Sequence, residues 1–339
     1  MLTKQNYIPE PETFIAESPL TPALLEIKKQ RDAEIKDVLS GKSNKMLVVI
    51  GPCSAHEPAP TLEYISRLGK VSQQVQDKLV LVPRIYTCKP RTKGVGYMGM
   101  LMQPNPEGGV DVVQGIRTAR ALHIAAMELS GLSAADEMLY PENAAYLEDL
   151  LSYHAVGARS VENQLHRQVA SGMDAPVGMK NPMSGNLTAL MNSIYAAQSP
   201  QTFKYRNYQV SSEGNPYAHA ILRGGVDGTG ADVPNFHHDR VEKIAKLYQE
   251  NGLKNPAVIV DCNHSNSGKD FKRQISIAQE VMQSRQDKAL SGIIKGVMLE
   301  SFLVEGNQPH NEVFGQSITD PCLGWEDTER LLMDIAEKV

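Results

Sequence analysis

Eight short apolar segments recur along this chain of 339 residues, and most of them are followed by apolar residues at helical spacing. Short apolar runs bounded by turn residues are typical of strands that are buried on both faces of a parallel sheet. The strands are expected to begin near residues 46, 79, 133, 156, 176, 219, 257 and 293. This alternation predicts an α/β fold, a (β/α)8 TIM barrel, with a doubly wound open sheet as the alternative.

Two segments fall outside the alternation. Residues 1–45 form an N-terminal extension with one amphipathic stretch at 22–39, and the catalytic barrel is expected to occupy residues 46–339. Residues 202–216 alternate tyrosine with polar residues around a Glu-Gly-Asn turn, which predicts an extra β-hairpin before the sixth strand. No G-x-G-x-x-G motif follows a strand, and this argues against a dinucleotide-binding fold.

The composition excludes several classes of protein. With 41% hydrophobic and 22% charged residues, the chain has ample material for a large core. A net charge of -5 argues against nucleic acid as a partner. The four cysteines form no CxxC pair, which fits a reducing compartment. No secretory signal and no membrane-length apolar run are visible, so a soluble cytoplasmic protein is expected, with no membrane partner.

The segment 84–92 (RIYTCKPRT) concentrates positive charge at the exit of a strand, because a proline within it ends the preceding apolar run. Arg84, Lys89 and Arg91 crowd this one strand end, whereas solvated charges are usually spread along a helix. The pattern indicates a site for phosphate or carboxylate groups, and Arg91 with Thr92 could hold one such anion. A basic turn on the surface is the alternative, and this segment alone favours neither interpretation.

Polar residues end the other expected strands as well, and in a barrel the carboxyl ends of the strands meet at one face, where the chemistry takes place. In chain order, the polar residues at the strand ends are Cys53, Arg84 with Lys89, Glu137, Arg159, Lys180, Arg223, His264 and Glu300.

Closure of the barrel would place the eighth strand between the seventh and the first. Cys53, His264 and Glu300 would then come from adjacent strands, and Asp320 lies in the loop that follows. Thiolate, imidazole and carboxylate groups are common metal ligands, so we predict one divalent metal held by these four residues. The mixed donor set suits Mn, Fe, Co or Zn better than Mg. Taken singly, a cysteine in the core or a hydrogen-bonded histidine is the plainer interpretation.

The remaining cations lie on the other side of the expected ring. The fourth strand, expected at 156–159 after a helix at 141–154, ends in Arg159, and the next two strands end in Lys180 and Arg223. Three cations match a phosphate dianion, which arginine can bind through two parallel hydrogen bonds. One metal and two anion sites imply two anionic substrates, one of which presents an oxygen to a Lewis acid.

The position of a further cysteine suggests a redox property. Without metal, a thiolate ligand at Cys53 is expected to have a low pKa, to be reached by solvent and to be open to oxidation. Cys322 lies only two residues beyond Asp320, so a disulfide between Cys53 and Cys322 is expected to be geometrically possible in the metal-free protein.

Nine ordered motifs, spread over most of the chain, resemble those of 3-deoxy-D-arabino-heptulosonate-7-phosphate (DAHP) synthases of the enteric-bacterial and fungal type. They are GPCS at 51–54, KPRT at 89–92, GAR at 157–159, PVGMK at 176–180, ILRGG at 221–225, DCNHSN at 261–266, LVEGNQ at 303–308, SITD at 317–320 and GWEDT at 324–328.

The resemblance implies a metal-dependent, aldol-type transferase that condenses phosphoenolpyruvate with D-erythrose 4-phosphate and water, and releases phosphate. This reaction is the first step of the shikimate pathway to the aromatic amino acids, and a homodimer or homotetramer is expected. Glu137 resembles a family residue near C2 of phosphoenolpyruvate, where water adds. By the same resemblance, the metal ligands are Cys53, His264, Glu300 and Asp320; the phosphate of phosphoenolpyruvate is held by Arg159, Lys180 and Arg223, its carboxylate by Arg84 and Lys89, and the phosphate of the aldose by Arg91 and Thr92.

Three alternatives remain at this point. A Schiff-base aldolase would use Lys89 or Lys180 as its nucleophile, although the expected metal ligands argue against it. The 3-deoxy-octulosonate 8-phosphate synthases share the barrel, but KPRT at 89–92 matches the family members with a four-carbon acceptor. A non-catalytic paralogue would be expected to have lost at least one residue at the strand ends, and all of them are retained.

Overall fold

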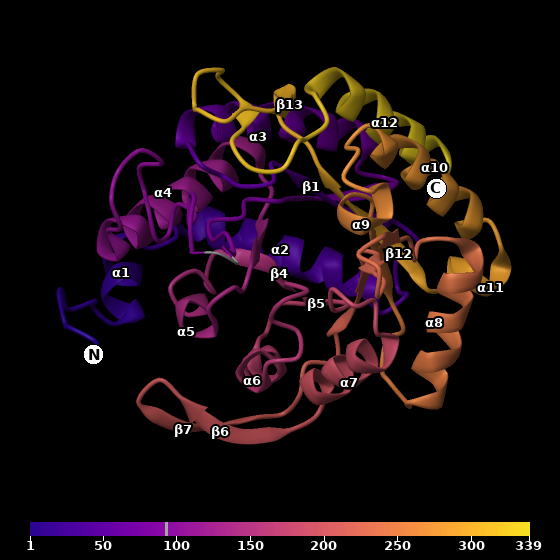
Figure 1. Cartoon of the computed structure of the whole chain (residues 1–339), viewed down its shortest axis with the longest axis horizontal. Coiled ribbons are helices and arrows are strands. Elements are labelled where there is room, and N and C mark those ends of the chain that lie inside the picture. Colours follow the sequence, from indigo (N-terminus) through magenta and orange to yellow (C-terminus); the bar gives the residue numbers. More distant parts are fainter. Residues whose placement is uncertain (92–93) are drawn as a thin grey trace.

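A closed ring of parallel strands forms the centre of the molecule (Figure 1). The computed structural model describes residues 1–91 and 94–339. The strands follow the order β2-β1-β12-β11-β8-β5-β4-β3, and a parallel bridge between Arg84 and Ala135 joins the two ends of this order. The prediction of an eight-stranded barrel is therefore confirmed. The strands are β1 (Met46–Gly51), β2 (Leu79–Pro83), β3 (Ala134–Glu137), β4 (Leu151–Val156), β5 (Val177–Lys180), β8 (His219–Leu222), β11 (Val258–Asp261) and β12 (Ile294–Glu300).

Helices surround the ring, and several begin at a side chain that accepts a hydrogen bond from their first turn, as Asp111, Asn163 and Asn186 do. Among the described residues, no helix combines the length and the apolar character needed to cross a bilayer. The longer helices are α2 (Pro22–Leu39), α3 (Pro58–Val75), α4 (Val112–Ser130), α6 (Gln164–Gly172), α7 (Leu187–Gln198), α8 (His238–Glu250), α10 (Arg273–Arg285) and α12 (Trp325–Glu337), and the shorter ones are α1 (Pro11–Glu17), α5 (Pro141–Ala144), α9 (His264–Ser267) and α11 (Lys288–Ser291).

The core has two parts because each strand is buried on both faces. In β1, Leu47 and Val49 belong to a cluster inside the ring, whereas Val48 and Ile50 pack outward against the helices. Helix α2 contributes Ile35, Val38 and Leu39 to the inner cluster. The N-terminal extension therefore shares the core of the barrel, and the domain boundary placed at residue 45 stays a prediction.

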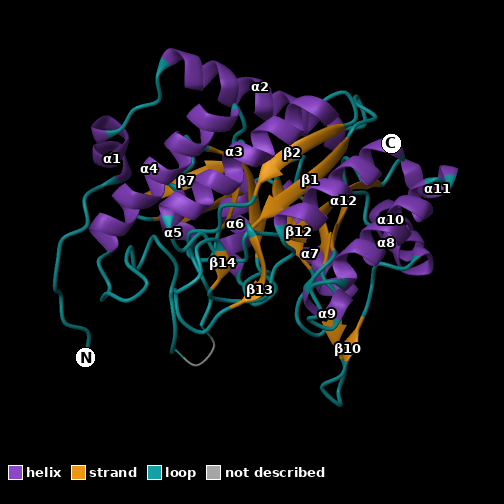
Figure 2. Ribbon diagram, turned by 90° about the horizontal axis from the view of Figure 1, so that it is seen from above, coloured by secondary structure: helices purple, strands orange, loops and turns teal. Residues whose placement is uncertain are grey.

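Three small two-stranded sheets extend from the ring. The antiparallel hairpin of β6 (Gln201–Tyr205) and β7 (Tyr208–Ser212) lies before β8, where the extra hairpin was predicted. The other two pairs are β9 (Gly225–Val226) with β10 (Asp232–Val233), and β13 (Val304–Asn307) with β14 (Gln316–Ser317). In Figure 2, β10, β13, β14 and α9 lie together on one side of the molecule, where the loops after the strands gather.

The fourth strand lies earlier in the chain than predicted. Residues 151–156 form β4, whereas 156–159 were expected, and the helix expected at 141–154 is reduced to α5 at 141–144. Leu151, Tyr153 and Ala155 do alternate with polar residues, but this run is short and directly follows Ala144 and Leu147, which lie at helical spacing with Leu151. The seventh strand also ends earlier, at Asp261, and His264 begins α9. Both corrections move a site residue from a strand into the loop or helix that follows.

Candidate active site

A cleft of about 550 Å³ lies at the carboxyl ends of the strands. It brings together residues from strands that are distant in the sequence, as the barrel prediction requires. Cys53 and Glu300 lie buried beside it, and Thr92 falls outside the described residues. The predicted site residues that line the cleft are Arg84, Lys89, Arg91, Glu137, Arg159, Lys180, Arg223, His264 and Asp320.

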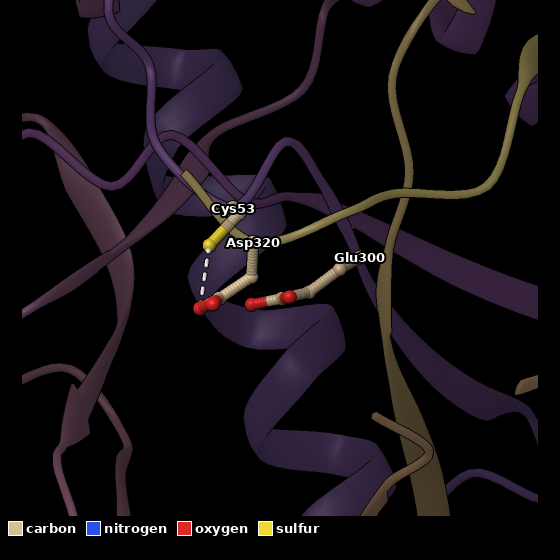
Figure 3. A group of neighbouring side chains, drawn as sticks. All are labelled: Cys53, Glu300 and Asp320. Carbon is tan, nitrogen blue, oxygen red and sulfur yellow. Dashed lines mark hydrogen bonds between the residues drawn. The ribbon is translucent and has the colours of Figure 1, made fainter. Parts of the chain in front are cut away.

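Three of the four predicted metal ligands form a compact group (Figure 3). Cys53 Sγ and one carboxylate oxygen each of Glu300 and Asp320 all lie within 4.8 Å of one another. The Cys53 thiol donates to Asp320 Oδ2 at 3.3 Å. His264 Nε2 lies 3.9 Å from Glu300 Oε1, so the fourth predicted ligand is adjacent to the group. One sulfur, two carboxylates and an imidazole fit a divalent transition-metal ion.

The environment of Cys53 differs from the one expected. The side chain is fully buried, and burial, with a further contribution from the charge of Glu300, raises the pKa of the thiol to about 11. The Cys53 amide donates to Cys322 Sγ at 3.4 Å, so the two cysteines are close, as the predicted disulfide requires. Burial also raises the pKa of Cys322 well above its ordinary value. The expectation of an exposed thiol with a low pKa was therefore wrong, because the thiol is buried and its pKa is raised.

Arg84 forms a buried ion pair with Glu300 and is not free to move in the cleft. Its Nη2 lies 2.9 Å from Glu300 Oε1, and both side chains are 1% exposed. The guanidinium also donates to the carbonyl of Pro52 and lies 3.7 Å from the centre of the Tyr86 ring. Asn263 donates to the other carboxylate oxygen of Glu300 at 2.6 Å. These contacts hold the Glu300 carboxylate at the candidate metal centre.

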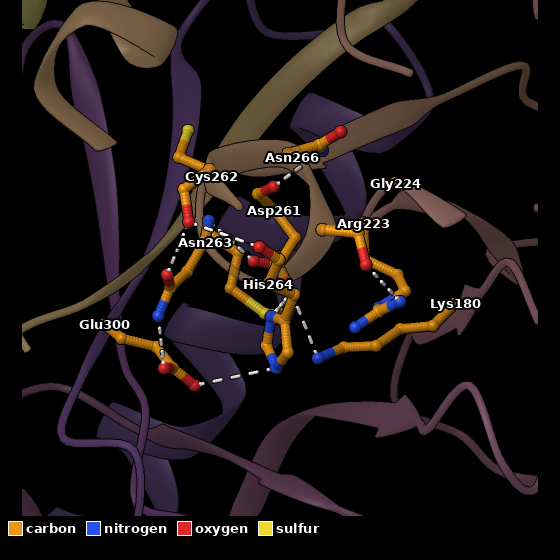
Figure 4. A network of polar contacts seen from close by, with 12 residues as sticks. Lys180, Arg223, Gly224, Asp261, Cys262, Asn263, His264, Asn266 and Glu300 are labelled. Atoms are coloured by element: carbon orange, nitrogen blue, oxygen red, sulfur yellow. Dashed lines mark hydrogen bonds and ion pairs between the residues drawn. The ribbon is translucent and has the colours of Figure 1, made fainter. Parts of the chain in front are cut away.

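Asp261 connects the candidate metal centre to the cations (Figure 4). Its Oδ2 lies 2.9 Å from His264 Nδ1 and 3.1 Å from Lys180 Nζ. Burial alone would raise the pKa of Asp261, but His264 and Lys180 hold it well below the ordinary value. His264 has a φ of 54°, in the left-handed region that non-glycine residues rarely adopt. Asp261 thus contacts a ring nitrogen of an imidazole that sits on strained backbone.

The three cations expected to bind a phosphate all line the cleft. Lys180 and Arg223 are almost fully buried, whereas Arg159 lies beyond the end of β4 and is exposed. Arg223 Nη1 donates to Ser265 Oγ at 3.2 Å. Burial lowers the pKa of Arg223, and the nearby charge of Arg159 lowers it further. An anion placed among these groups would offset their mutual repulsion.

Asp136 is a site residue that the sequence analysis missed. Its carboxylate accepts hydrogen bonds from the Thr87 amide at 2.9 Å, from the Thr87 hydroxyl and from the Glu137 amide at 2.7 Å. It therefore ties the segment that carries Lys89 to the end of β3. The Glu137 carboxylate packs against Gly157 so closely that a β-carbon there would lie 2.3 Å from Oε1. The signal for Asp136 was its place at the end of the third strand, next to a residue already selected.

The fold and the cleft together define a class of protein, namely barrel enzymes that act on anionic substrates beside a candidate metal centre. Within this class, the chain belongs to the DAHP synthetase I family, whose family model matches residues 24–333.

Individual relatives agree with this assignment. The chain is 39% identical over 344 residues to the Tyr-sensitive phospho-2-dehydro-3-deoxyheptonate aldolase of Salmonella typhimurium, an alignment that covers 98% of this chain and 94% of that protein. It is 37% identical over 347 residues to the phospho-2-dehydro-3-deoxyheptonate aldolase of Haemophilus influenzae, covering 100% and 93%. Among solved structures, the corresponding aldolase of Francisella tularensis SCHU S4 superposes with a TM-score of 0.92 at 32% identity, covering 100% and 98%.

Proposed function

We propose that this enzyme is a metal-dependent DAHP synthase. It condenses phosphoenolpyruvate with D-erythrose 4-phosphate and water to form DAHP and phosphate, as the first step of the shikimate pathway. One observation best supports the proposal. A single cleft contains a cluster of cations, and beside them lie one thiol and two carboxylates that could hold a metal. A cytoplasmic location and a homodimer or homotetramer belong to the same proposal and rest on the family resemblance.

The cations of the cleft divide between the two ends of phosphoenolpyruvate. Arg159, Lys180 and Arg223 bind its phosphate, because their side chains line one region of the cleft. Lys89 binds the carboxylate of phosphoenolpyruvate. Arg84, which is already paired with Glu300, adds positive charge from the buried wall of the cleft. This division orients the enolpyruvate so that C3 faces the other half of the cleft.

The remaining half of the cleft would take the second substrate and the metal. Cys53, His264, Glu300 and Asp320 would hold one divalent ion, Mn, Fe, Co or Zn, and such an ion acts as a Lewis acid toward an aldehyde oxygen. Arg91 binds the phosphate of the aldose; its Nε donates to the carbonyl of Tyr97 at 2.6 Å, which fixes the orientation of the guanidinium.

The reaction joins the two substrates through one new carbon–carbon bond. C3 of phosphoenolpyruvate attacks the aldehyde carbon, water adds at C2, and the bond between C2 and the phosphate oxygen breaks. Glu137 lies at the end of β3 in the cleft and accepts a proton from the water. The oxygen of the water becomes the C2 carbonyl oxygen of the product. One of its protons passes through Glu137 to the former aldehyde oxygen, which becomes a hydroxyl, and the other leaves with the phosphate.

A phosphate-release assay with a panel of aldose phosphates tests the function. Fast release with erythrose 4-phosphate and slow release with arabinose 5-phosphate are expected. The reverse preference would identify a 3-deoxy-octulosonate 8-phosphate synthase. Borohydride reduction in the presence of substrate tests the Schiff-base alternative, and a covalent adduct on Lys89 or Lys180 would establish it. We expect no adduct, and loss of activity in a metal chelator.

Replacing Arg159 with Ala is expected to weaken phosphoenolpyruvate binding far more than aldose binding. Loss of one charge-assisted contact to phosphate corresponds to about 2 kcal/mol, or roughly a 30-fold rise in KM for phosphoenolpyruvate. Steady-state kinetics with each substrate varied in turn would measure both constants. An equal rise in the two KM values would show that the division of the cleft is wrong.

Replacing Asp136 with Ala is expected to lower kcat by about 10- to 100-fold, because Lys89 and Glu137 lose the carboxylate that fixes their relative position. Asp136→Asn keeps one acceptor oxygen and should recover part of the loss. Circular dichroism and Tm would show whether the variants remain folded. A folded Asp136→Ala enzyme with the kcat of the parent would rule out this positioning role.

A further inference from the structure

A large cavity lies away from the candidate active site. It has a volume of about 1180 Å³ and lies beneath the amino ends of the strands. Its walls come from the turn after α2 (residues 40–45), the end of α8 with the loop that follows, and the segment from Arg285 to the start of β12. Lys295 is the second residue of β12, and Glu300 at the candidate metal centre is the last, so the two sites lie at opposite ends of one strand.

Lys295 is a buried cation in the wall of this cavity. The pairing of β11 with β12 skips it, because Val258 pairs with Ile294 and Ile259 pairs with Gly296. Its side chain is 9% exposed, and its ammonium lies near the α2 turn, where a β-carbon on Gly41 would be 3.7 Å from Nζ. Within residues 1–91 and 94–339, no hydrogen-bond acceptor or carboxylate pairs with this ammonium. The bulge thus places an unpaired charge in the cavity wall.

The groups that face Lys295 do not neutralise its charge. Arg285 lines the same cavity and donates to two backbone carbonyls, that of Asn44 at 2.9 Å and that of Ile294 at 3.4 Å, so its own charge has no carboxylate partner there. Burial lowers the pKa of Lys295, and the charge of Arg285 lowers it further. Glu242, an acidic residue in the cavity wall, is paired with Lys246 at 2.8 Å.

The Lys295 side chain is largely buried while its ammonium opens onto the cavity; partial desolvation of this charge is costly, and a second cation beside it adds repulsion. A bound anion would remove both costs, since it could contact the Lys295 ammonium and the free edge of the Arg285 guanidinium together. The side chains of Ser40, Ser43 and Asn44 add polar groups to the same wall. We propose that this cavity is a second anion site, which binds a small molecule through a phosphate or carboxylate group held by Lys295 and Arg285.

The test compares how inorganic phosphate affects the Tm of the parent enzyme and of Lys295→Met. Phosphate is added at constant ionic strength against chloride. The parent is expected to gain about 2 °C more than Lys295→Met. Phosphate bound in the candidate active site raises the Tm of both proteins and cancels in the comparison. In chloride alone, Lys295→Met should melt at or above the parent, because an unpaired buried charge has been removed.

Lys246→Met is the matched control, because Lys246 lines the same cavity but is exposed and paired with Glu242. It should respond to phosphate as the parent does. Lys295→Gln, which keeps a polar head group, is measured in parallel, so a folding defect of the Met variant does not remove the test. An equal phosphate response in the parent and in the folded Lys295 variants would overturn the proposal.

Discussion

Cys53→Ser is expected to lose its bound metal and at least about 100-fold in turnover. Loss of a hydrogen-bonding partner of a ligand already lowers metal affinity or activity by about 10- to 100-fold, and removal of a ligand should cost no less. The thiol lies within 4.8 Å of both carboxylates of the group and is the sulfur donor that makes the set suitable for a transition metal. Metal content per chain after dialysis, measured by mass spectrometry, is the primary observation.

Cys322→Ser provides the control for this experiment. Cys322 is as deeply buried as Cys53 and lies beside it, but it is not part of the group that could hold a metal. Its variant should keep both metal and turnover. Stoichiometric metal with near-normal turnover in Cys53→Ser would end the assignment of Cys53 as a ligand and leave it as a core residue.

Arg84→Met is expected to destabilise the metal-free protein by about 3–5 kcal/mol, because it leaves the Glu300 carboxylate buried without its cation. A divalent metal ion should recover part of this loss, since it supplies the missing positive charge next to Glu300. Urea unfolding with and without Mn²⁺ would give both free energies of unfolding.

The double variant Arg84→Met with Glu300→Gln separates the pair from other effects of Arg84. Removing the second charge should restore much of the stability of the single variant in the absence of metal. A loss below about 1 kcal/mol in Arg84→Met, or a metal effect no larger than that in the parent, would show that the ion pair is not the main support of Glu300.

The fold could be predicted because its main signal is repeated. A single apolar run that ends in a polar residue is weak evidence for a strand. Eight such runs that alternate with helical segments fit few architectures other than a barrel. The error at β4 arose where two patterns overlap: Ala144, Leu147 and Leu151 lie at helical spacing, and the short alternation of residues 151–156 begins at the last of them. The order of the strands around the ring followed from closure, and β12 does lie between β11 and β1.

The composition of the site could be predicted better than its environment. The residues chosen at the strand ends meet in one cleft because parallel strands bring their carboxyl ends to one face. Asp261 and Asp136 were missed because they act through other side chains, although each lies at a strand end beside a residue that was selected. The burial of Cys53 and the pairing of Arg84 with Glu300 depend on loops from distant parts of the chain, which local sequence does not specify.

The bridge between Arg84 and Ala135 closes the ring at the point where β2 and β3 would otherwise remain open edges. Directly beyond this bridge, the Asp136 carboxylate takes hydrogen bonds from Thr87 that a continued ladder would have supplied to the backbone. This side chain therefore continues the closure of the barrel beyond the backbone bridge, and it sets the spacing of two groups proposed to act on substrate. Substitution of Asp136 is expected to have two effects, because a change that weakens the contact between β2 and β3 also displaces Lys89 from Glu137. Selection for a stable protein and selection for an active one would then be indistinguishable at this position.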